Sequence, residues 1–406
     1  MSTDRPRLLV LASTYPRWRD DPEPGFVHEL CRRLASRFEV IVVCPHAPGA
    51  LHQEDLDGVE VHRYRYAPSC WERLVNDGGI VGNLRRHRWM LALVPGFVVM
   101  QAWHAWRIAR QRPITVLHAH WLIPQGAIAA ALQLILRRPI PYVVTSHGAD
   151  LYALRAKPVV TLKKWVLKRA AAITVVSSAM RKLVVQMGVP AHAVNVLPMG
   201  VDLAERFVPA KSVRDGNELL FVGRLVEKKG LRHLIDAMPL VLQEFPHATL
   251  TIAGFGPDEG PLKALAGKRD VAHAVRFLGA VPQAKLPALY QRASVFVAPF
   301  VTAATGDQEG LPVALMEAVG CGCPVVAGYV QGLEDILGED TPVITVDPTD
   351  AQALALRIVG VLRAPDEAQA TAARVRSRAH DLLDWSQVER RYGDVLAQAC
   401  SGGLRR

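Results

Sequence analysis

Two glutamates eight positions apart frame the run of residues best suited to chemistry. Glu309 and Glu317 lie within EGLPVALMEAVGCG (309–322). Pro312 predicts the first turn of a helix, and the glycines near the end of the run predict where it stops. Glu309 is therefore expected in the loop ahead of the helix and Glu317 inside it. Carboxylates accept hydrogen bonds from hydroxyl groups and a helix N-terminus favours an anion, so the run predicts a polar ligand site.

A pair of cations forms a second group with chemical potential. FVGRLVEKKG (221–230) places Arg224 just past a predicted strand and Lys229 at the start of the next helix, with Gly223 available for a close turn. Arginine can bind two phosphate oxygens at once and lysine supplies a point charge, so the pair suits a diphosphate. The alternative is a basic loop that only faces solvent.

Glycines mark two further turns between a strand and a helix. IAGFGP (252–257) includes Gly254 and suits the close approach of a phosphate or a ribose. Gly25 ends a proline-rich loop and precedes the helical pattern FVHELCRRLASR, so its backbone N–H is a candidate to reach an anion.

Histidines follow two predicted strands of the first half, in HAHW (118–121) and SHGAD (146–150). The carboxyl ends of parallel strands share one sheet edge, so these side chains are expected together there: His118, His120, His147 and Asp150. Their spacing matches no defined metal motif, and the single DxD, from Asp55 to Asp57, falls in a predicted turn. We expect no catalytic metal.

Several enzyme classes lack their motifs here. The chain has no GxSxG nucleophile elbow, no kinase loops and no P-loop. What remains is a diphosphate clamp beside carboxylates that can accept hydrogen bonds from neutral hydroxyls. This combination points to a nucleotide-sugar as the ligand.

Short apolar strands alternate with helical patterns along all 406 residues, which predicts two α/β domains built on parallel sheets. A polar stretch over 202–217 indicates the boundary between them. We expect an N-terminal acceptor-binding domain over 1–202, a C-terminal nucleotide-sugar-binding domain over 203–375, and a C-terminal helix over 376–406 that returns to the first domain. The expected strands are 7–14, 39–45, 59–66, 115–120, 141–148, 171–178, 194–200, 219–224, 248–256, 275–281, 294–300, 323–328 and 342–346.

Positive charge is concentrated in the first half of the chain. Residues 1–200 hold 26 Lys and Arg against 13 Asp and Glu, and the remainder holds 22 against 25. The first domain is therefore expected to meet an anionic partner: a membrane surface, a phosphate-bearing acceptor or nucleic acid. A basic surface without a partner is the other interpretation.

One apolar segment, WMLALVPGFVVMQAWHAW (89–106), bears on the choice of partner. Its charge-free core from Trp89 to Met100 is shorter than the roughly 20 residues that span a bilayer, and Pro95-Gly96 interrupts it. We expect a buried or interfacial helix seated on an anionic membrane rather than a span.

The beginning of the chain and its cysteines indicate the compartment. The apolar run near the N-terminus is too short for a secretory signal. The six scattered cysteines indicate a reducing compartment, and Cys321 and Cys323 are expected in the core rather than on a metal. The expected location is the cytoplasm, at the inner face of the plasma membrane.

The order of these motifs resembles the family 4 retaining glycosyltransferases with the GT-B fold, and among them the bacterial enzymes of cell-surface polysaccharide synthesis. Glu309 and Glu317 match the E-x7-E element of that family, and FVGRLVEKKG, IAGFGP, RFLGAV and PMGVD match further features in the same order. The resemblance implies two Rossmann-like, doubly wound domains that face each other across a cleft. The chain departs from the family at Gly25, which follows Pro24 where the family has a double glycine.

The resemblance also implies a role for each matched residue. Glu317 would hold the donor ribose, and Glu309 would face the transferred sugar, whose hydroxyls would also meet the backbone amides of Gly310 and Leu311. Arg224 and Lys229 would clamp the diphosphate, and His147 would lie near the anomeric carbon. The remaining donor-binding residues would be Gly25, Gly223, Gly254, Leu278 and Val281, with the base read by backbone near the last two.

The activity implied is metal-independent, retaining transfer of a hexose from a UDP- or GDP-sugar, with UDP favoured, and it needs no cofactor. The expected acceptor is a lipid-linked or cell-surface glycan, and the alternative is a small soluble sugar or metabolite. A nucleic-acid-binding protein with a degenerate pair of Rossmann domains would show salt-dependent binding to any polynucleotide. The chain has no RNA- or DNA-binding module, and its set of donor-binding residues is intact. We therefore expect no nucleic-acid partner.

Overall fold

Parallel strands alternate with helices through both halves of the computed structural model, which describes residues 5–19, 21, 25–75, 79–152, 156–209, 214, 216–304 and 306–402. The chain divides into one unit of Met1–Pro198 with Val388–Arg406 and a second unit of Met199–Gln387. These limits differ from the expected boundaries at 202 and 375. Helix α15 (Pro365–Leu383) runs unbroken past residue 375 and packs on α11 (Val313–Gly320) within the second unit.

The described part of the first unit contains one eight-stranded sheet with the order β3-β4-β2-β1-β5-β6-β7-β8. Its pairs are parallel except β3 with β4, which is antiparallel. All these strands were predicted except β3. It was missed because its sequence, QEDL, is polar, as an edge strand can be. The strands are β1 (Arg7–Leu11), β2 (Glu39–Pro45), β3 (Gln53–Leu56), β4 (Val59–Tyr64), β5 (Val116–His120), β6 (Tyr142–Ser146), β7 (Ala172–Val175) and β8 (Val194–Val196).

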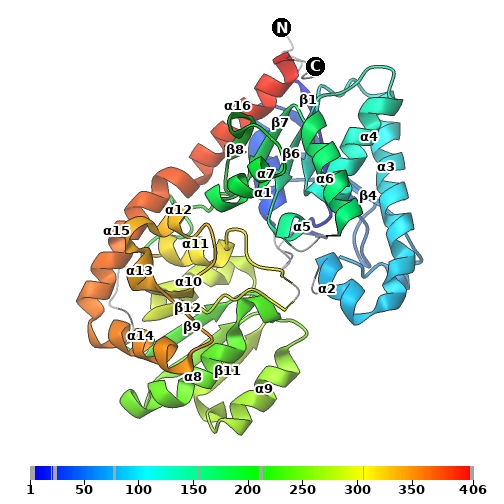
Figure 1. The fold of residues 1–406 in the computed structure, drawn as a ribbon. Helices are drawn as coiled ribbons and strands as arrows, with labels where there is room; N and C mark the ends of the chain where they lie inside the picture. The colour runs from blue at the N-terminus through cyan, green and yellow to red at the C-terminus, as the bar shows by residue number, and fades with distance from the viewer. Residues whose placement is uncertain are drawn as a thin grey trace. The chain divides into compact units, whose positions relative to one another are not determined.

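Helices of the first unit cover this sheet, and α3, α4 and α6 pack next to one another on one side of it (Figure 1). The apolar segment over 89–106 forms a 3-10 turn, η2 (Arg88–Ala92), and then the long helix α3. No helix among the described residues is long and apolar enough to cross a membrane. The helices are α1 (Phe26–Leu34), α2 (Gly79–Arg86), α3 (Leu93–Gln111), α4 (Ala127–Ile135), α5 (Ala149–Tyr152), α6 (Lys157–Arg169), α7 (Ser178–Gln186) and α16 (Trp385–Gly402), which begins in the second unit.

The described part of the second unit contains one six-stranded parallel sheet with the order β11-β10-β9-β12-β13-β14. The strand expected over 342–346 is reduced to the two residues of β14, because Pro342 starts a short helix ahead of it. The strands are β9 (Glu218–Val222), β10 (Thr249–Ala253), β11 (Val275–Gly279), β12 (Val295–Ala298), β13 (Val325–Gly328) and β14 (Thr345–Val346).

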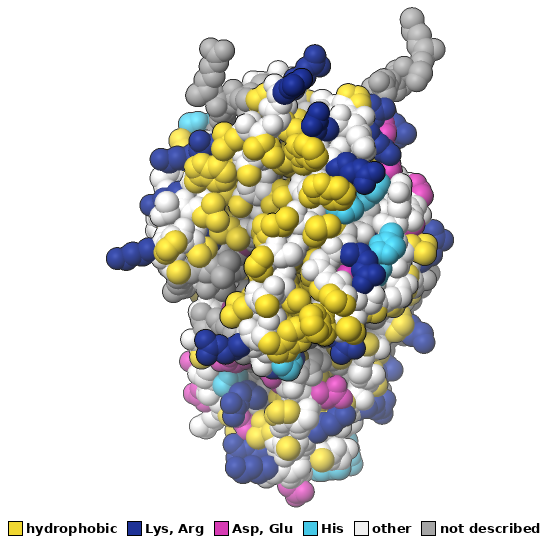
Figure 2. Space-filling view, turned by 90° about the vertical axis from the view of Figure 1, so that its right-hand side faces the viewer, with side chains coloured by type: hydrophobic (Ala, Val, Ile, Leu, Met, Phe, Trp, Pro, Cys, Tyr) yellow, Lys and Arg dark blue, Asp and Glu magenta, His cyan; other side chains and the backbone are white. Residues whose placement is uncertain are grey.

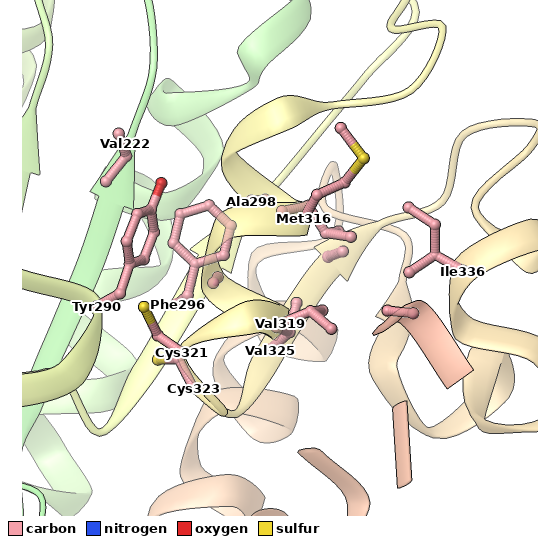
Figure 3. Packing of buried hydrophobic residues seen from close by; sticks show 14 of the residues in the cluster. Val222, Tyr290, Phe296, Ala298, Met316, Val319, Cys321, Cys323, Val325 and Ile336 are labelled. Carbon is pink, nitrogen blue, oxygen red and sulfur yellow. The ribbon is translucent and has the colours of Figure 1, made fainter. Parts of the chain in front are cut away.

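Two apolar clusters fill the two faces of the second sheet. In one of them the Tyr290 ring packs edge-on against Phe296 (5.5 Å between ring centroids), close to Cys321 and Cys323 (Figure 3). Both cysteines are fully buried and unpaired, which confirms the core position predicted for them. The other helices of the unit are α8 (Leu231–Glu244), α9 (Glu259–Lys268), α10 (Leu286–Arg292), α12 (Glu334–Leu337), α13 (Thr341–Ile344) and α14 (Ala351–Arg363).

Candidate active site

Three turns meet at the carboxyl edge of the second sheet. Backbone N–H groups join the turns after β9, β10 and β11, from Gly223 to Ala253 O (3.0 Å) and from Gly254 to Gly279 O (2.8 Å). Gly254 has a φ of +157°, and a Cβ there would lie 1.9 Å from Gly223 O. Gly254 was predicted to let a ligand approach. The structure shows that the close packing of these two turns already requires a glycine at this position.

Glu309 is a buried carboxylate held between two ammonium groups. The Nζ atoms of Lys228 and Lys229 lie 3.4 Å and 3.3 Å from its two oxygens, and its side chain is 12% exposed. Burial alone raises a carboxyl pKa, but Lys228, Lys229 and Arg224 outweigh it and hold the pKa of Glu309 at about 2. Oε1 nevertheless accepts no hydrogen bond of good geometry. One oxygen of this ionised carboxylate is therefore ion-paired with Lys228 but accepts no hydrogen bond.

Lys228 and Glu227 complete the support of the loop that carries Glu309, and the sequence reasoning missed both. The Lys228 ammonium lies 3.3 Å from Asp307, its carbonyl accepts from Val301 N (3.0 Å), and the Glu227 carboxylate accepts from Ala304 N (2.8 Å). The 3-10 turn Glu227–Lys229 therefore fixes this loop from both sides. The only sequence signal for this support was the pair of adjacent lysines, Lys228 and Lys229. The sequence analysis assigned Lys229 to the diphosphate and gave Lys228 no role.

Arg224 and Lys229 are placed differently within the cation cluster. Burial lowers the pKa of Lys229 while Glu309 raises it, and the ammonium also lies 5.2 Å from the centre of the Phe300 ring. Arg224 is half-buried, and its side chain forms no hydrogen bond or ion pair with any residue that the structure describes. Its guanidinium is therefore free to bind an anion without first breaking a contact.

Glu317, on α11, is buried between two hydrogen-bond donors. It is 3% exposed, and its two oxygens accept hydrogen bonds from Gln283 Nε2 (2.5 Å) and the Tyr290 hydroxyl (2.9 Å). Burial raises the pKa of Glu317 to about 7, although these two bonds and the charges of Arg206 and Lys229 favour the ionised form. Arg206 was not predicted; its position four residues after the matched PMGVD turn was the available signal.

The raised pKa of Glu317 predicts a pH-dependent stability. In the unfolded chain the carboxyl ionises near its ordinary pKa of about 4.5, so between pH 4.5 and pH 7 the folded chain binds the extra proton and stability falls as pH rises. The glutamine variant Glu317→Gln should lack this fall, which is worth up to roughly 3 kcal/mol. Denaturant unfolding of both proteins at pH 5 and pH 8 measures it, with the exposed Glu339→Gln as control. If the free energy of unfolding changes equally between pH 5 and pH 8 in Glu317→Gln and in the parent, the raised pKa of Glu317 is refuted.

The other donor-binding residues predicted in the second unit lie at the same sheet edge. The backbone N–H groups of Gly310 and Leu311, just ahead of α11, donate no hydrogen bond to a described residue. Leu278, the next-to-last residue of β11, is exposed, and Val281 follows in the turn that leads to Gln283. Free amides and an accessible strand end are thus both present.

In the first unit, the four predicted polar side chains gather at the ends of β5 and β6. The His120 and His147 rings stack at 5.2 Å and share a hydrogen bond between Nδ1 and Nε2 (2.9 Å). Burial lowers the pKa of His147 to about 3, so its ring is neutral, and His120 Nε2 is buried without a partner. The Asp150 carboxylate instead accepts hydrogen bonds from Leu122 N (2.6 Å) and the Ser146 hydroxyl (2.8 Å), so it ties the turn after β5 to the end of β6.

Aromatic side chains that the sequence did not single out surround His147. The rings of Phe26 and Trp121 each lie 5.0 Å from it. Trp121 has a φ of +75°, a conformation that costs energy for a side chain of this size and that concentrates at functional sites. Gly25, the N-cap of α1, has an ordinary φ of −90° and room for a Cβ, so nothing within the described chain requires a glycine there.

Within the part of the chain that the structure describes, no group of three or more His, Cys, Asp or Glu side chains is arranged to hold a metal ion. The sites above are therefore built from carboxylates, cations, free amides and neutral imidazoles.

Family models match most of both units. The model described as Glycosyltransferase Family 4 matches residues 26–205, and that described as Glycosyl transferases group 1 matches residues 205–378. Among curated relatives, the glycogen synthase of Mycobacterium tuberculosis is 30% identical over 71% of this chain and 69% of its own. The GDP-mannose-dependent alpha-(1-6)-phosphatidylinositol monomannoside mannosyltransferase of Mycolicibacterium smegmatis is 31% identical over 64% and 70%. The amylovoran biosynthesis glycosyltransferase AmsK of Erwinia amylovora is 37% identical over 42% of each chain.

Solved structures share the fold at lower identity. Sucrose-phosphate synthase from Thermosynechococcus elongatus has a TM-score of 0.77 at 20% identity and covers 98% of this chain and 100% of its own. HepE from Anabaena in complex with UDP-glucose has a TM-score of 0.71 at 18% identity and covers 97% and 99%. The fold is GT-B, as the sequence predicted. The chain belongs to glycosyltransferase family 4, and it is a hexosyltransferase that uses a nucleotide-sugar.

Proposed function

We propose that this enzyme transfers a hexose from a nucleoside-diphosphate sugar to a lipid-linked or cell-surface glycan, with retention of configuration and without a metal. The observation that carries the proposal is the Oε1 oxygen of Glu309, which accepts no hydrogen bond and is buried among Lys228, Lys229 and the unpaired Arg224. A ligand that fits must present both an anion for the cations and a hydroxyl for the carboxylate. The sugar diphosphate of a donor carries both.

The donor is assigned residue by residue along the carboxyl edge of the second sheet. Arg224 and Lys229 bind the diphosphate, and Glu309 with the free amides of Gly310 and Leu311 binds the hydroxyls of the transferred sugar. Glu317 accepts from the ribose hydroxyls in addition to its present donors, since a carboxylate has about four acceptor positions. The base lies against the backbone at 278–281.

Two residues of the first unit are assigned to the same reaction. The neutral His147 acts at the reacting sugar, held in orientation by its hydrogen bond to His120. Gly25 offers its N–H to the β-phosphate at the start of α1, where room remains around its Cα.

Retention follows from attack on the face that the leaving group occupies. The bond between the anomeric carbon and the diphosphate oxygen breaks, and the acceptor hydroxyl oxygen bonds to the same face of that carbon. The acceptor proton passes to the departing diphosphate, whose charge Arg224 and Lys229 stabilise. Glu309 is not the nucleophile; Lys228 and Lys229 keep it ionised as an acceptor for hydroxyls.

A UDP-sugar is the favoured donor, supported by the HepE neighbour that was solved with UDP-glucose. The mycobacterial mannosyltransferase relative depends on GDP-mannose, so GDP-sugars are the competing class. The relatives named for amylovoran and for a phosphatidylinositol mannoside support a cell-surface or lipid-linked acceptor, and with it a location at the inner face of the plasma membrane. The sucrose-phosphate synthase neighbour supports the alternative, a small soluble sugar or metabolite as acceptor.

A thermal-shift panel of UDP-, GDP- and ADP-sugars tests the donor. A ligand at about 100 times its dissociation constant adds roughly 2.7 kcal/mol to the stability of the protein that binds it. We expect one UDP-sugar to raise the melting temperature and to be hydrolysed slowly in the absence of acceptor. Radiolabelled sugar should then enter an organic-extractable product when membrane lipids are supplied. Label that stays wholly in the aqueous product would favour the alternative acceptor, and a panel without any stabilising sugar would overturn the donor site.

A further inference from the structure

The positive charge of the first unit comes from one continuous part of the chain. Between Asp77 and Asp202 the sequence holds 16 Lys and Arg and a single acidic residue, Asp150, which is 4% exposed. Residues 1–77 hold 10 Lys and Arg against 12 Asp and Glu. The basic character of the unit is therefore carried by the segment that forms α2, α3, α4, α6 and α7.

Large apolar side chains of the same segment are exposed to solvent. Val99 and Trp103 lie four residues apart on the outer side of α3, and they are 61% and 45% exposed. On α4, which packs beside α3, Leu134 and Ile135 are exposed to a similar degree. Figure 2 looks onto this side and shows a broad band of hydrophobic side chains with Lys and Arg along its borders. We call the outer surface of η2, α3 and α4 the α3–α4 face; its exposed large apolar residues are Trp89, Leu91, Val99, Trp103, Leu134 and Ile135.

Cations border the α3–α4 face at one end of its two helices. Arg107 and Arg110 lie on the last turns of α3, with their guanidinium groups 5.6 Å and 5.1 Å from the rings of Trp103 and Trp106. Arg137 and Arg138 follow the C-cap residue of α4, Leu136, and both are exposed. None of these four arginines pairs with a carboxylate of any described residue, so their charge is available to an external anion.

We infer that the α3–α4 face docks on the surface of an anionic lipid bilayer. Tryptophan rings and aliphatic side chains enter the boundary between headgroups and acyl chains, while arginines at the border meet lipid phosphates. A second copy of this chain fits poorly, because two such faces would bring unpaired arginines against each other. A polynucleotide fits poorly because Val99, Leu134 and Ile135 offer it neither charge nor a planar ring to stack on.

This face stands beside the proposed function and does not depend on the identity of the donor. It does account for an acceptor that resides in lipid, since docking brings a peripheral enzyme to the membrane without a span. The contribution expected from each arginine near an anionic surface is about a fivefold change in partition.

Flotation of the full chain with vesicles tests the inference, using neutral phosphatidylcholine and a mixture with phosphatidylglycerol, at low and high salt. We expect binding to the anionic vesicles at low salt and little to the neutral ones. The double variant Arg137→Gln/Arg138→Gln should bind about 30-fold more weakly. The matched control Lys263→Gln/Lys268→Gln, on α9 of the second unit, should bind as the parent does.

A second pair of variants tests the apolar part of the face. Val99→Ser/Trp103→Ser/Leu134→Ser should lose most of the binding, and Leu51→Ser/Val343→Ser/Leu356→Ser, equally exposed residues outside the face, should not. Equal loss in the controls, or equal binding to neutral vesicles, would overturn the inference. So would a dimer in lipid-free sedimentation that the first triple variant dissociates, because the occupant would then be a second copy. Donor-induced thermal shifts in all variants separate this outcome from failure of the proposed donor site.

Discussion

Replacing Glu309 with glutamine is expected to lower the rate of sugar transfer by about 10²–10³-fold while the affinity for the free nucleoside diphosphate stays the same or rises. Glutamine keeps the size of the side chain and one acceptor oxygen, but it removes the negative charge that Lys228 and Lys229 neutralise. The lysines then have more positive charge to offer a diphosphate. The hydroxyls of the transferred sugar lose a charged acceptor, which is the stronger kind of hydrogen-bond partner.

The two effects are separated by measuring them on one preparation. Isothermal titration with UDP, or with whichever diphosphate the panel selects, gives the affinity, and single-turnover transfer from the sugar donor gives the rate. Glu259→Gln, at a half-buried carboxylate that pairs with Lys263 on α9, serves as the control and should change neither quantity. Parallel loss of affinity and rate in Glu309→Gln would mean that Glu309 supports the loop rather than the sugar.

The loop itself shows why the sequence could predict the residue but not its surroundings. Pro312 and the helical pattern placed Glu309 ahead of α11 and Glu317 inside it, and both positions are confirmed. The partners of Glu309 come from a turn some 80 residues earlier in the chain. Lys228 contacts Asp307 and Glu309 only because β9 and β12 are neighbours in the sheet, which no local pattern reports.

A similar limit applies to Glu317. Its helical position could be predicted, whereas its pKa depends on burial and on Tyr290 and Gln283, which lie on another helix and turn. The strand pattern, by contrast, was largely sufficient, because buried parallel strands are continuous apolar runs. It failed at β3, whose edge position tolerates QEDL, and at 342–346, where Pro342 favours a helical turn.

Charge shows a third kind of limit. Counting Lys and Arg over the first 200 residues predicted a basic domain but not where its charge lies. The fold places α3 and α4 next to each other and turns Val99, Trp103 and Leu134 outward beside the arginines. A net charge thereby becomes a surface with one apolar and one cationic part.

Replacing Arg224 with alanine is expected to weaken donor binding and to lower the transfer rate together, with a combined loss of about 10²–10³-fold in kcat/KM. The charge on the diphosphate grows as the bond to the anomeric carbon breaks, so the guanidinium contributes more to the transition state than to the bound donor. Because the Arg224 side chain has no ion pair or hydrogen bond to a described residue, its removal should leave the stability of the empty protein almost unchanged.

Because the Arg224 side chain has no partner to lose, its substitution tests the diphosphate clamp more cleanly than substitution of Lys229. Lys229 is paired with Glu309, so its removal would also leave a buried carboxylate without compensation. Arg224→Lys keeps the charge and loses the two parallel bonds to phosphate oxygens, so its rate should fall between those of the parent and Arg224→Ala. The nearby Arg232→Ala, on the exposed side of α8, is the matched control.

The order of the four rates then decides what Arg224 does. A parent and an Arg232→Ala variant of equal rate, a slower Arg224→Lys and a much slower Arg224→Ala identify a guanidinium that binds the leaving diphosphate. If Arg224→Ala instead melts several degrees lower and regains its rate when the donor is saturating, the side chain supports the turn after β9 and the clamp rests on Lys229. The position of Arg224 beside an ionised carboxylate would in that case be explained by packing, and the diphosphate would be bound by Lys229 without Arg224.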